Sequence, residues 1–300
     1  MTGLPWGRRF LMCPPEHFGV LYEINPWMNS EVAVSPDAAV AQWERLVDTL
    51  RAAGAEVVVM EPHPDVPDLV FTANAGVVSG GRFVPSHFRH PERQPETEID
   101  ATWFAGQGWR VERLSADVDH EGAGDALPFA GGNGRSVLLS GYRLRSDATA
   151  ATELSALLGC PVRPIELVDE RLYHLDLTFC PLDARRAIVA PLGWDAYGRK
   201  VVEALVPEPL VLTDEEALSF CANSVVVGST IVMPQVPPRV GRQLEAWGFT
   251  VAESRVDEFL KAGGGCRCLT LALDVVLTPD APPLPPLARG DAPAGDAPGR

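Results

Sequence analysis

Apolar positions along the chain alternate between the spacing of a helix and the spacing of a strand. From Val40 to Leu50 the apolar residues recur every three or four positions, which places them on one face of a helix. Ser35 suits the N-cap of this helix, Pro36 suits its first turn, and Gly54 suits the position after its end. The apolar run at residues 56–60 then predicts a strand.

The same succession of helix, turn and strand recurs through the chain. The turns at residues 54, 108, 159, 207 and 248 are spaced by about 40 to 55 residues, which is typical of a repeated supersecondary unit. Five units with alternating helices and strands predict an α/β ring, with the loops of each unit collected around its axis. An ordinary doubly wound α/β sheet is the alternative. Further strands are expected at residues 74–78, 82–84, 136–140, 186–190, 224–228 and 231–233.

The last part of the chain changes in composition. From Pro279 onward the sequence is rich in proline, glycine, alanine and aspartate, which is typical of a segment without a packed core. We therefore expect a single catalytic domain over residues 1–279 and a disordered tail over residues 280–300.

Composition narrows the classes of partner. A formal net charge of −15 over 300 residues disfavours nucleic acid and anionic lipid, and it is compatible with a small cationic ligand. The chain has no apolar run long enough to span a bilayer and no signal-peptide pattern at its start, so we expect a cytoplasmic protein. The six cysteines are dispersed, which predicts reduced thiols, and their spacing gives no support for a structural metal.

A triple glycine precedes two of these cysteines. Residues Gly263–Gly265 are followed by Cys266 and Cys268, and an apolar strand is expected over residues 269–273. Three glycines suggest that the backbone is approached closely there, and a thiol beside such a run is a candidate nucleophile. A buried cysteine is more often an inert part of a core, so this pattern alone leaves the role of the thiol open.

Polar residues gather in corresponding places of three other repeats. His174 and Asp176 alternate with leucines, so we expect them on one face of a strand, where a carboxylate can orient an imidazole for acid–base work. Glu121 and Asp125 lie in a loop of small residues, and the expected strand over residues 68–74 has a polar group at each end. A closed ring would bring all of these groups to its axis.

These segments resemble the ordered signature of the guanidine-modifying pentein superfamily. The resemblance covers nearly the whole chain to about residue 275, and it implies a five-bladed α/β propeller with pseudo-fivefold symmetry. It also implies a cysteine-dependent enzyme that needs no cofactor or metal. The matching segments are Asp68–Asn74, Glu121–Asp125, His174–Asp176 and Gly263–Cys268.

The resemblance assigns roles to individual residues. Cys268 matches the nucleophile, His174 the general acid and base, and Glu121 the acid that clamps the guanidinium, in a motif with one inserted residue. Arg145 matches the arginine that holds the substrate carboxylate, and Arg93 matches a second arginine on the substrate side. Further substrate contacts are expected from Asp68, Phe71, Asp125, Asp176 and, at the entry loop, Asn25.

Asn74 departs from most of the superfamily. Arginine deiminases and dimethylarginine dimethylaminohydrolases have an aspartate there, whereas Asn74 resembles the arginine dihydrolase branch, which converts arginine to ornithine, ammonia and carbon dioxide. A neutral amide at this position lets a ureido product stay bound and meet the thiol a second time. The expected function is therefore arginine dihydrolysis through a covalent thiouronium intermediate on Cys268.

Several alternatives remain open at the level of sequence. A dimethylarginine dimethylaminohydrolase or a deiminase would release citrulline, and an amidinotransferase would pass the amidino group to an amine. A protein of another class, a pentein that binds a partner without catalysis, is disfavoured by the joint presence of Cys268, His174 and Glu121. The sequence predicts a small cationic guanidino substrate and gives no indication of the oligomeric state.

Overall fold

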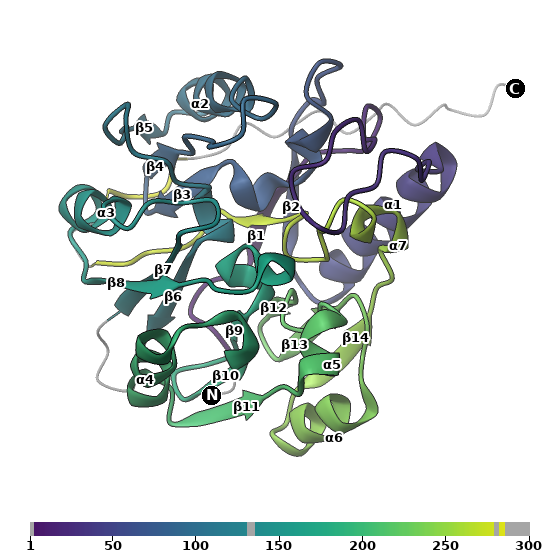
Figure 1. The fold of residues 1–300 in the computed structure, drawn as a ribbon, viewed down its shortest axis with the longest axis vertical. Coiled ribbons are helices and arrows are strands. Elements are labelled where there is room, and N and C mark those ends of the chain that lie inside the picture. Colours follow the sequence, from purple (N-terminus) through teal and green to yellow (C-terminus); the bar gives the residue numbers. More distant parts are fainter. Residues whose placement is uncertain (1–2, 131–135, 279–281, 286–300) are drawn as a thin grey trace, which may run out of the picture.

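Five small sheets surround a common axis. The computed structural model describes residues 3–130, 136–278 and 282–285, and Figure 1 shows its sheets arranged in a ring with the helices outside. Each sheet has three strands and forms one blade of a propeller. The blades are, in chain order, β3 (Gly76–Ser79), β4 (Arg82–Pro85) and β5 (Arg110–Val111); β6 (Ala126–Ala130), β7 (Ser136–Tyr142) and β8 (Val162–Glu166); β9 (Phe179–Pro181), β10 (Arg186–Val189) and β11 (Glu208–Val211); β12 (Val225–Val227), β13 (Thr230–Met233) and β14 (Thr250–Glu253); and β15 (Leu271–Ala272), β1 (Arg9–Met12) and β2 (Glu56–Val59).

Every blade has the same internal design. Its first strand pairs antiparallel with the middle strand, and the middle strand pairs parallel with the third, as β7 does with β6 and β8. Because a parallel pair needs a crossover connection, a helix lies between the middle and third strands of each blade. These helices are α2 (Glu96–Gly106), α3 (Ala150–Leu158), α4 (Ala196–Leu205), α6 (Pro238–Ala246) and α1 (Pro36–Ala52), and two short helices, α5 (Asp214–Leu218) and α7 (Asp257–Leu260), lie in connections between blades.

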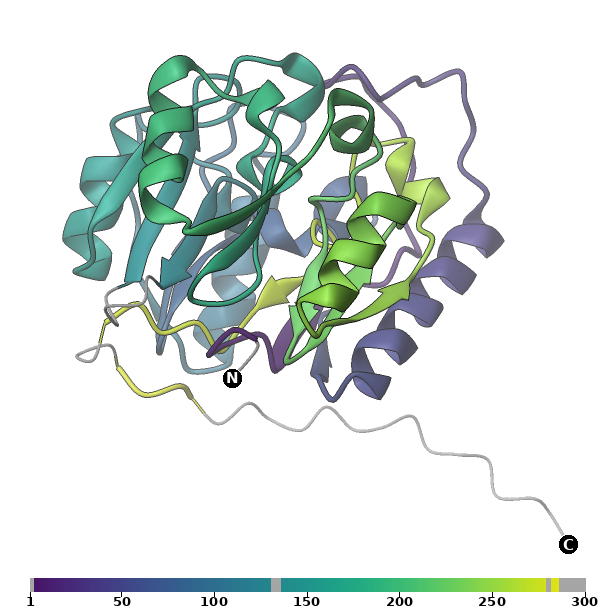
Figure 2. The same cartoon turned by 90° about the horizontal axis from the view of Figure 1, so that it is seen from below.

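One blade is built from both ends of the chain. The strand β1 lies between β15 and β2, with Phe10 opposite Ala272 and Leu11 opposite Leu271. Pairing of residues about 260 positions apart closes the ring. Figure 2 shows the β1 and β15 segments side by side at the centre of the lower face.

The repeat pattern predicted from the sequence is confirmed. Ser35 caps α1 by accepting a hydrogen bond from the amide of Ala38, and α1 ends before Gly54. Gly159 follows α3 with a left-handed φ of 69°, a conformation that favours glycine. No sheet among the described residues has more than three strands, so the alternative of one doubly wound sheet is wrong.

Two short strands expected near the axis are turns instead, and a third is shorter than expected. Residues 68–74 form two 3-10 turns, Leu175–Leu177 forms another, and the strand expected over residues 269–273 is only β15. The alternation misled because Leu175 and Leu177 are both fully buried, each in a different hydrophobic cluster, so the intervening Asp176 need not lie on a strand. Polar and apolar alternation therefore arises here from a turn packed on both sides.

The core follows the ring. All three residues of β12 are buried, and between blades the apolar side chains of neighbouring sheets join into continuous clusters. In the first blade, the rings of Phe83 on β4 and Phe104 on α2 stack with centroids 3.6 Å apart. No helix in the described part of the chain is long and apolar enough to cross a membrane.

Part of the expected tail is described. The carbonyl of Pro282 accepts a hydrogen bond from the amide of Gly81, and Leu284 packs against a buried cluster of the first blade. Residues 279–281 and 286–300 lie outside the described residues, so the boundary at residue 279 stays a prediction.

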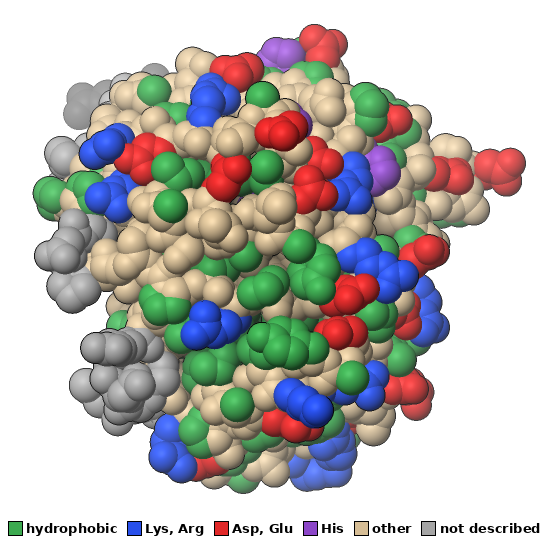
Figure 3. Space-filling model, turned by 60° about the vertical axis from the view of Figure 1, so that its left-hand side comes forward, with side chains coloured by type: hydrophobic (Ala, Val, Ile, Leu, Met, Phe, Trp, Pro, Cys, Tyr) green, Lys and Arg blue, Asp and Glu red, His purple; other side chains and the backbone are tan. Residues whose placement is uncertain are grey.

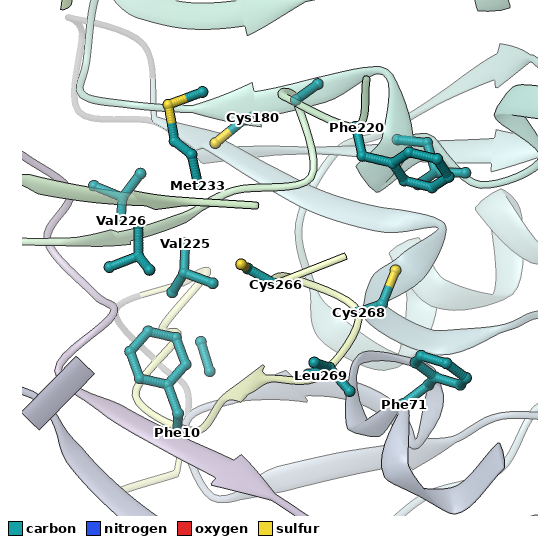
Figure 4. Close-up of a cluster of buried hydrophobic side chains, with 14 of the residues drawn as sticks. Phe10, Phe71, Cys180, Phe220, Val225, Val226, Met233, Cys266, Cys268 and Leu269 are labelled. Atoms are coloured by element: carbon teal, nitrogen blue, oxygen red, sulfur yellow. The ribbon is translucent and has the colours of Figure 1, made fainter. Parts of the chain in front are cut away.

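Closure by β1 can be tested through Phe10, which is 1% exposed and points into the cluster of Figure 4. Replacing Phe10 by alanine is expected to lower the free energy of unfolding by about 3–5 kcal/mol, since it leaves a cavity between two blades. Urea denaturation measures the effect. The matched control is Val59→Ala on β2, where the side chain is 47% exposed; an equal loss in both variants would contradict a closing role for Phe10.

Candidate active site

Five turns meet at the axis of the propeller. Each turn comes just before the first strand of a blade. Four of these turns carry the residues singled out from the sequence. The turns end at Asn74 before β3, Asp125 before β6, Thr178 before β9, Ser224 before β12 and Thr270 before β15.

Hydrogen bonds join each turn to the next around a closed circle. Side chains make three of the five links, and buried polar atoms are satisfied by them. The links run from Ala73 N to Cys268 O (3.1 Å), from Asn74 Nδ2 to Glu121 O (3.1 Å), from Leu175 N to Asp125 Oδ1 (3.0 Å), from Asn223 Nδ2 to Asp176 O (3.3 Å), and from Arg267 N to Asn223 O (3.2 Å).

The thiol of Cys268 lies at the floor of the resulting cavity. It donates to Asp176 Oδ2 over 3.4 Å, and Asn223 Nδ2 lies 3.1 Å from its sulfur. Burial, and then the carboxylate of Asp176, raise the pKa of Cys268 well above its usual value, while hydrogen bonds from the backbone of Gly265 and from Asn223 lower it. The resting group is therefore a protonated thiol, and it needs a positive charge nearby to become a thiolate.

The triple glycine before Cys268 is explained by two close approaches. A Cβ at Gly264 would lie 2.2 Å from the ring of Phe71, and a Cβ at Gly265 would lie 2.7 Å from Asn223 Oδ1. Side chains at these positions would therefore push Phe71 and Asn223 away from the thiol. The expectation of a closely approached backbone is confirmed.

Cys266 and Cys268 point to different sides of their loop. Figure 4 shows the sulfur of Cys266 turned toward Val225, whereas the sulfur of Cys268 points away from that cluster. Cys266 is fully buried and its thiol donates to the carbonyl of Ser254 over 3.3 Å. Of the two, Cys268 alone lines the cavity.

An imidazole and a guanidinium share one carboxylate oxygen. His174 Nε2 lies 2.8 Å from Glu121 Oε2, and Arg145 Nη1 donates to the same oxygen over 2.9 Å. Burial alone would raise the pKa of Glu121, but Arg145 and the hydrogen bond with His174 outweigh it and hold the pKa well below the usual range. Glu121 is thus an anion that fixes the ring of His174 and the fork of Arg145.

A second buried arginine, Arg93, also lines the cavity. Arg93 binds Glu96 with two hydrogen bonds of 2.8 and 2.7 Å and donates from Nη1 to Asn74 Oδ1 over 3.0 Å. Its Nε lies 3.8 Å from a carboxylate oxygen of Asp68. Burial raises the pKa of Glu96 to about 7, although Arg93 lowers it. The two hydrogen bonds to Glu96 fix the orientation of the Arg93 guanidinium.

Three buried carboxylate oxygens around the site have no hydrogen-bond partner among the described residues. They are Asp68 Oδ1, Glu121 Oε1 and Asp176 Oδ1. Burial raises the pKa of Asp176 to about 6, while His174 and Arg267 lower it, and burial also raises the pKa of Asp68. Buried acceptors of this kind are costly unless a donor binds them, so they mark a place for a cationic ligand with several N–H groups.

The cavity above the thiol has an empty volume of about 250 Å³. A shallower hollow, of about 650 Å³ by the same measure, lies next to it and shares Ile24, Asn25, Arg145 and Tyr173 with it. Glu23 and Glu170 are exposed around this outer hollow, so its field attracts cations. The lining of the inner cavity is Ile24, Asn25, Met28, Asp68, Phe71, Asn74, Arg93, Arg145, Tyr173, Ala262, Gly264 and Cys268.

The structure brings together nearly all the residues expected from the sequence. Asn25, Asp68, Phe71, Asn74, Arg93, Arg145 and Cys268 line the cavity. Glu121 and Asp176 are hydrogen-bonded to lining residues, and His174 is hydrogen-bonded to Glu121. Asp125 differs from the others: Ser146 Oγ donates to one of its oxygens and the amide of Leu175 to the other. Its carboxylate is thereby engaged in the joint between two blades.

Tyr173 was not anticipated. Its hydroxyl donates to the carbonyl of Gly263 over 2.8 Å, and its ring lies 4.6 Å below the guanidinium of Arg145. It therefore supports both the loop of the thiol and an arginine of the cavity wall. The sequence feature that could have identified Tyr173 is its position directly before His174.

The surface outside the site has a mixed charge. On the face shown in Figure 3, acidic and basic side chains are interspersed and no broad basic patch appears. The described residues contain no group of three or more histidine, cysteine or acidic side chains arranged to hold a metal ion.

Comparisons with known proteins agree with this geometry. The family model described as N,N dimethylarginine dimethylhydrolase, eukaryotic, matches residues 23–275. The bifunctional arginine dihydrolase/ornithine cyclodeaminase ArgZ of Synechocystis sp. is 40% identical over 275 residues, which are 91% of this chain and 38% of the relative. The chain thus spans well under half the length of that relative.

Two further comparisons cover both partners almost completely. The N(G),N(G)-dimethylarginine dimethylaminohydrolase of Mycobacterium tuberculosis is 37% identical over 90% of this chain and 87% of the relative. A solved structure of the N-terminal domain of ArgZ, an asparagine-to-serine mutant covalently bonded to a reaction intermediate, superimposes with a TM-score of 0.86 at 40% identity, covering 90% of this chain and 99% of that one. The chain belongs to the dimethylarginine dimethylaminohydrolase family, and its five blades are those of a pentein propeller.

Proposed function

We propose that the chain is a cysteine-dependent hydrolase of arginine that removes both terminal nitrogens of the guanidinium group. The observation that carries this proposal is the set of unpartnered oxygens on Asp68, Glu121 and Asp176 beside the thiol of Cys268. A guanidinium has five N–H donors in one plane, and its charge supplies what the buried thiol lacks. The 40% identity to ArgZ supports arginine as the substrate.

The first step is attack of sulfur on the guanidinium carbon. The bound cation lowers the pKa of Cys268, and the thiol proton passes to His174. The thiolate forms a bond to the carbon, and the carbon–nitrogen bond breaks as His174 gives that proton to the leaving ammonia. Glu121 holds His174 in place through its Nε2 contact of 2.8 Å. The product on the enzyme is a thiouronium adduct of Cys268.

Hydrolysis of that adduct restores the thiolate. His174, now neutral, takes a proton from water, the oxygen bonds to the central carbon, and the carbon–sulfur bond breaks to release a ureido group. One cycle therefore converts arginine and water into citrulline and ammonia. A second cycle on the ureido group consumes another water and gives ornithine, a second ammonia and carbon dioxide.

Asn74 supports the second cycle. Its Oδ1 accepts from Arg93 and its Nδ2 donates to the carbonyl of Glu121, so the side chain is held in one orientation without adding charge to the cavity. An aspartate there would add a negative charge that favours the cationic guanidinium over the neutral ureido group. The neutral amide therefore favours retention of the first product.

Hydrolysis of dimethylated arginine is a second candidate. The family model and the 37% identity to the Mycobacterium tuberculosis enzyme favour it. In that reaction dimethylamine leaves in place of ammonia and catalysis stops at citrulline.

The role of the thiol is tested by Cys268→Ser. The hydroxyl is a far weaker nucleophile, so turnover of arginine is expected to fall by at least about a thousandfold. The matched control is Cys266→Ser, two residues away and buried, which should keep turnover near that of the unmodified protein. Retained activity in the Cys268 variant would remove the proposed mechanism.

The number of cycles is tested by product analysis with Asn74→Asp. The unmodified protein should give ornithine with two ammonia per arginine, whereas the variant should accumulate citrulline because its added carboxylate disfavours the ureido group. Mass spectrometry of products from arginine, dimethylarginine and agmatine measures this. Asn29→Asp, which adds the same charge at an exposed position, is the control. Citrulline accumulating without ornithine in the unmodified protein would contradict dihydrolysis.

A further inference from the structure

The fourth blade contributes to the axis a residue that the proposed mechanism does not use. The turn before β12 ends with the buried residues Asn223 and Ser224, and Asn223 is fully buried. It is absent from the lining of the cavity, so its side chain serves groups of the protein and not the substrate.

Asn223 makes contacts with both the backbone and the sulfur of the nucleophile. Its Oδ1 accepts from the amide of Arg267 over 3.1 Å and from the amide of Cys268 over 3.2 Å. Its Nδ2 lies 3.1 Å from Cys268 Sγ and 3.3 Å from the carbonyl of Asp176. The side-chain amide of Asn223 therefore fixes the position of Cys268 and also supplies a hydrogen-bond donor to its sulfur.

Only an amide satisfies this set of partners. The two backbone N–H groups require an acceptor, whereas the carbonyl of Asp176 and a thiolate require a donor. A carboxylate of the same shape would keep the acceptor and lose the donor. The neighbouring Gly265 leaves room for this side chain, since a Cβ there would lie 2.7 Å from Asn223 Oδ1.

An internal repeat gives independent support. Phe220–Asn223 reads Phe-Cys-Ala-Asn, and Phe71–Asn74 in the first blade reads Phe-Thr-Ala-Asn. In both, the backbone N–H of the asparagine donates to the carbonyl of the phenylalanine over 2.9 Å. In both, the asparagine also lies two residues before the first strand of its blade. The two asparagines are equivalent under the pseudo-symmetry, but Asn74 faces the cavity and Asn223 faces the sulfur.

We infer that Asn223 is a positioning residue that holds the nucleophilic loop and stabilises the thiolate of Cys268 through its Nδ2. Without it the backbone hydrogen bond from Gly265 would be left as the donor that opposes the carboxylate of Asp176 at the sulfur. The inference rests on the proposed function only for the statement that Cys268 is the nucleophile. It concerns the reactivity of the thiol itself, which can be measured without substrate.

The test compares alkylation of Cys268 by iodoacetamide across a range of pH, followed on the peptide that contains it by mass spectrometry. In Asn223→Asp the added carboxylate disfavours the thiolate, so alkylation at pH 8 should be roughly tenfold or more slower and should recover at higher pH. In Asn223→Ser the shorter side chain withdraws the N–H donor from the sulfur without adding charge, so the shift should have the same direction and be smaller. If the Asn223→Asp variant does not fold, the pH profile of the Asn223→Ser variant tests the inference.

Thr270→Val is the matched control. Its hydroxyl donates to the carbonyl of Arg267 in the same turn over 3.1 Å and makes no contact with the sulfur, so its loss loosens the turn alone. This variant should keep the pH profile of alkylation. A profile unchanged in folded Asn223 variants, or shifted as much by Thr270→Val, would overturn the inference.

Turnover of arginine separates this inference from the proposed function. Since Asn223 does not line the cavity, its variants should lower kcat with little change in KM. A protein that fails to turn over arginine but still shows the shifted alkylation profile would disprove the proposed function and leave the role of Asn223 standing.

Discussion

The closed circle of hydrogen bonds at the axis is the constraint on which the site depends. Each reactive group stands on a turn that is bonded to the turns of the two neighbouring blades, so no group can shift without straining two joints. The whole propeller thus acts as a rigid support for a few side chains, which is the condition for precise catalysis. Asp125 has a part in this circle, because its carboxylate connects one blade to the next.

The charged side chains inside this circle are almost fully buried. Arg145 and His174 share Oε2 of Glu121, which leaves Oε1 available. A guanidinium substrate can therefore bind Glu121 beside these partners instead of displacing them. Burying paired charges costs desolvation energy, and breaking one pair would strand the other partner. The arrangement is held by the surrounding fold, and ligand binding completes it.

Much of the fold could be predicted because its signals are local. Helix caps such as Ser35, glycines such as Gly159 and the recurring helix-to-strand succession are each readable within one unit. The turns at the axis were mistaken for strands because Leu175 and Leu177 are buried on opposite sides of one turn. Convergence of Cys268, His174 and Glu121 followed from their equivalent places in different repeats. The link between Asn223 and the sulfur could not be predicted, since it depends on how two blades face each other.

The blade shared by β1 and β15 has a consequence for how the protein is made. During synthesis Cys268 leaves the ribosome well after the other residues around the cavity, which are Asn25, Arg93, Glu121, Arg145 and His174. The strand that follows Cys268, β15, then pairs with β1, which precedes all of them in the chain. Until that pairing occurs, the sheet of β1 and β2 lacks its third strand. The pairing that completes this sheet is therefore also the one that fixes the segment next to Cys268 at the axis.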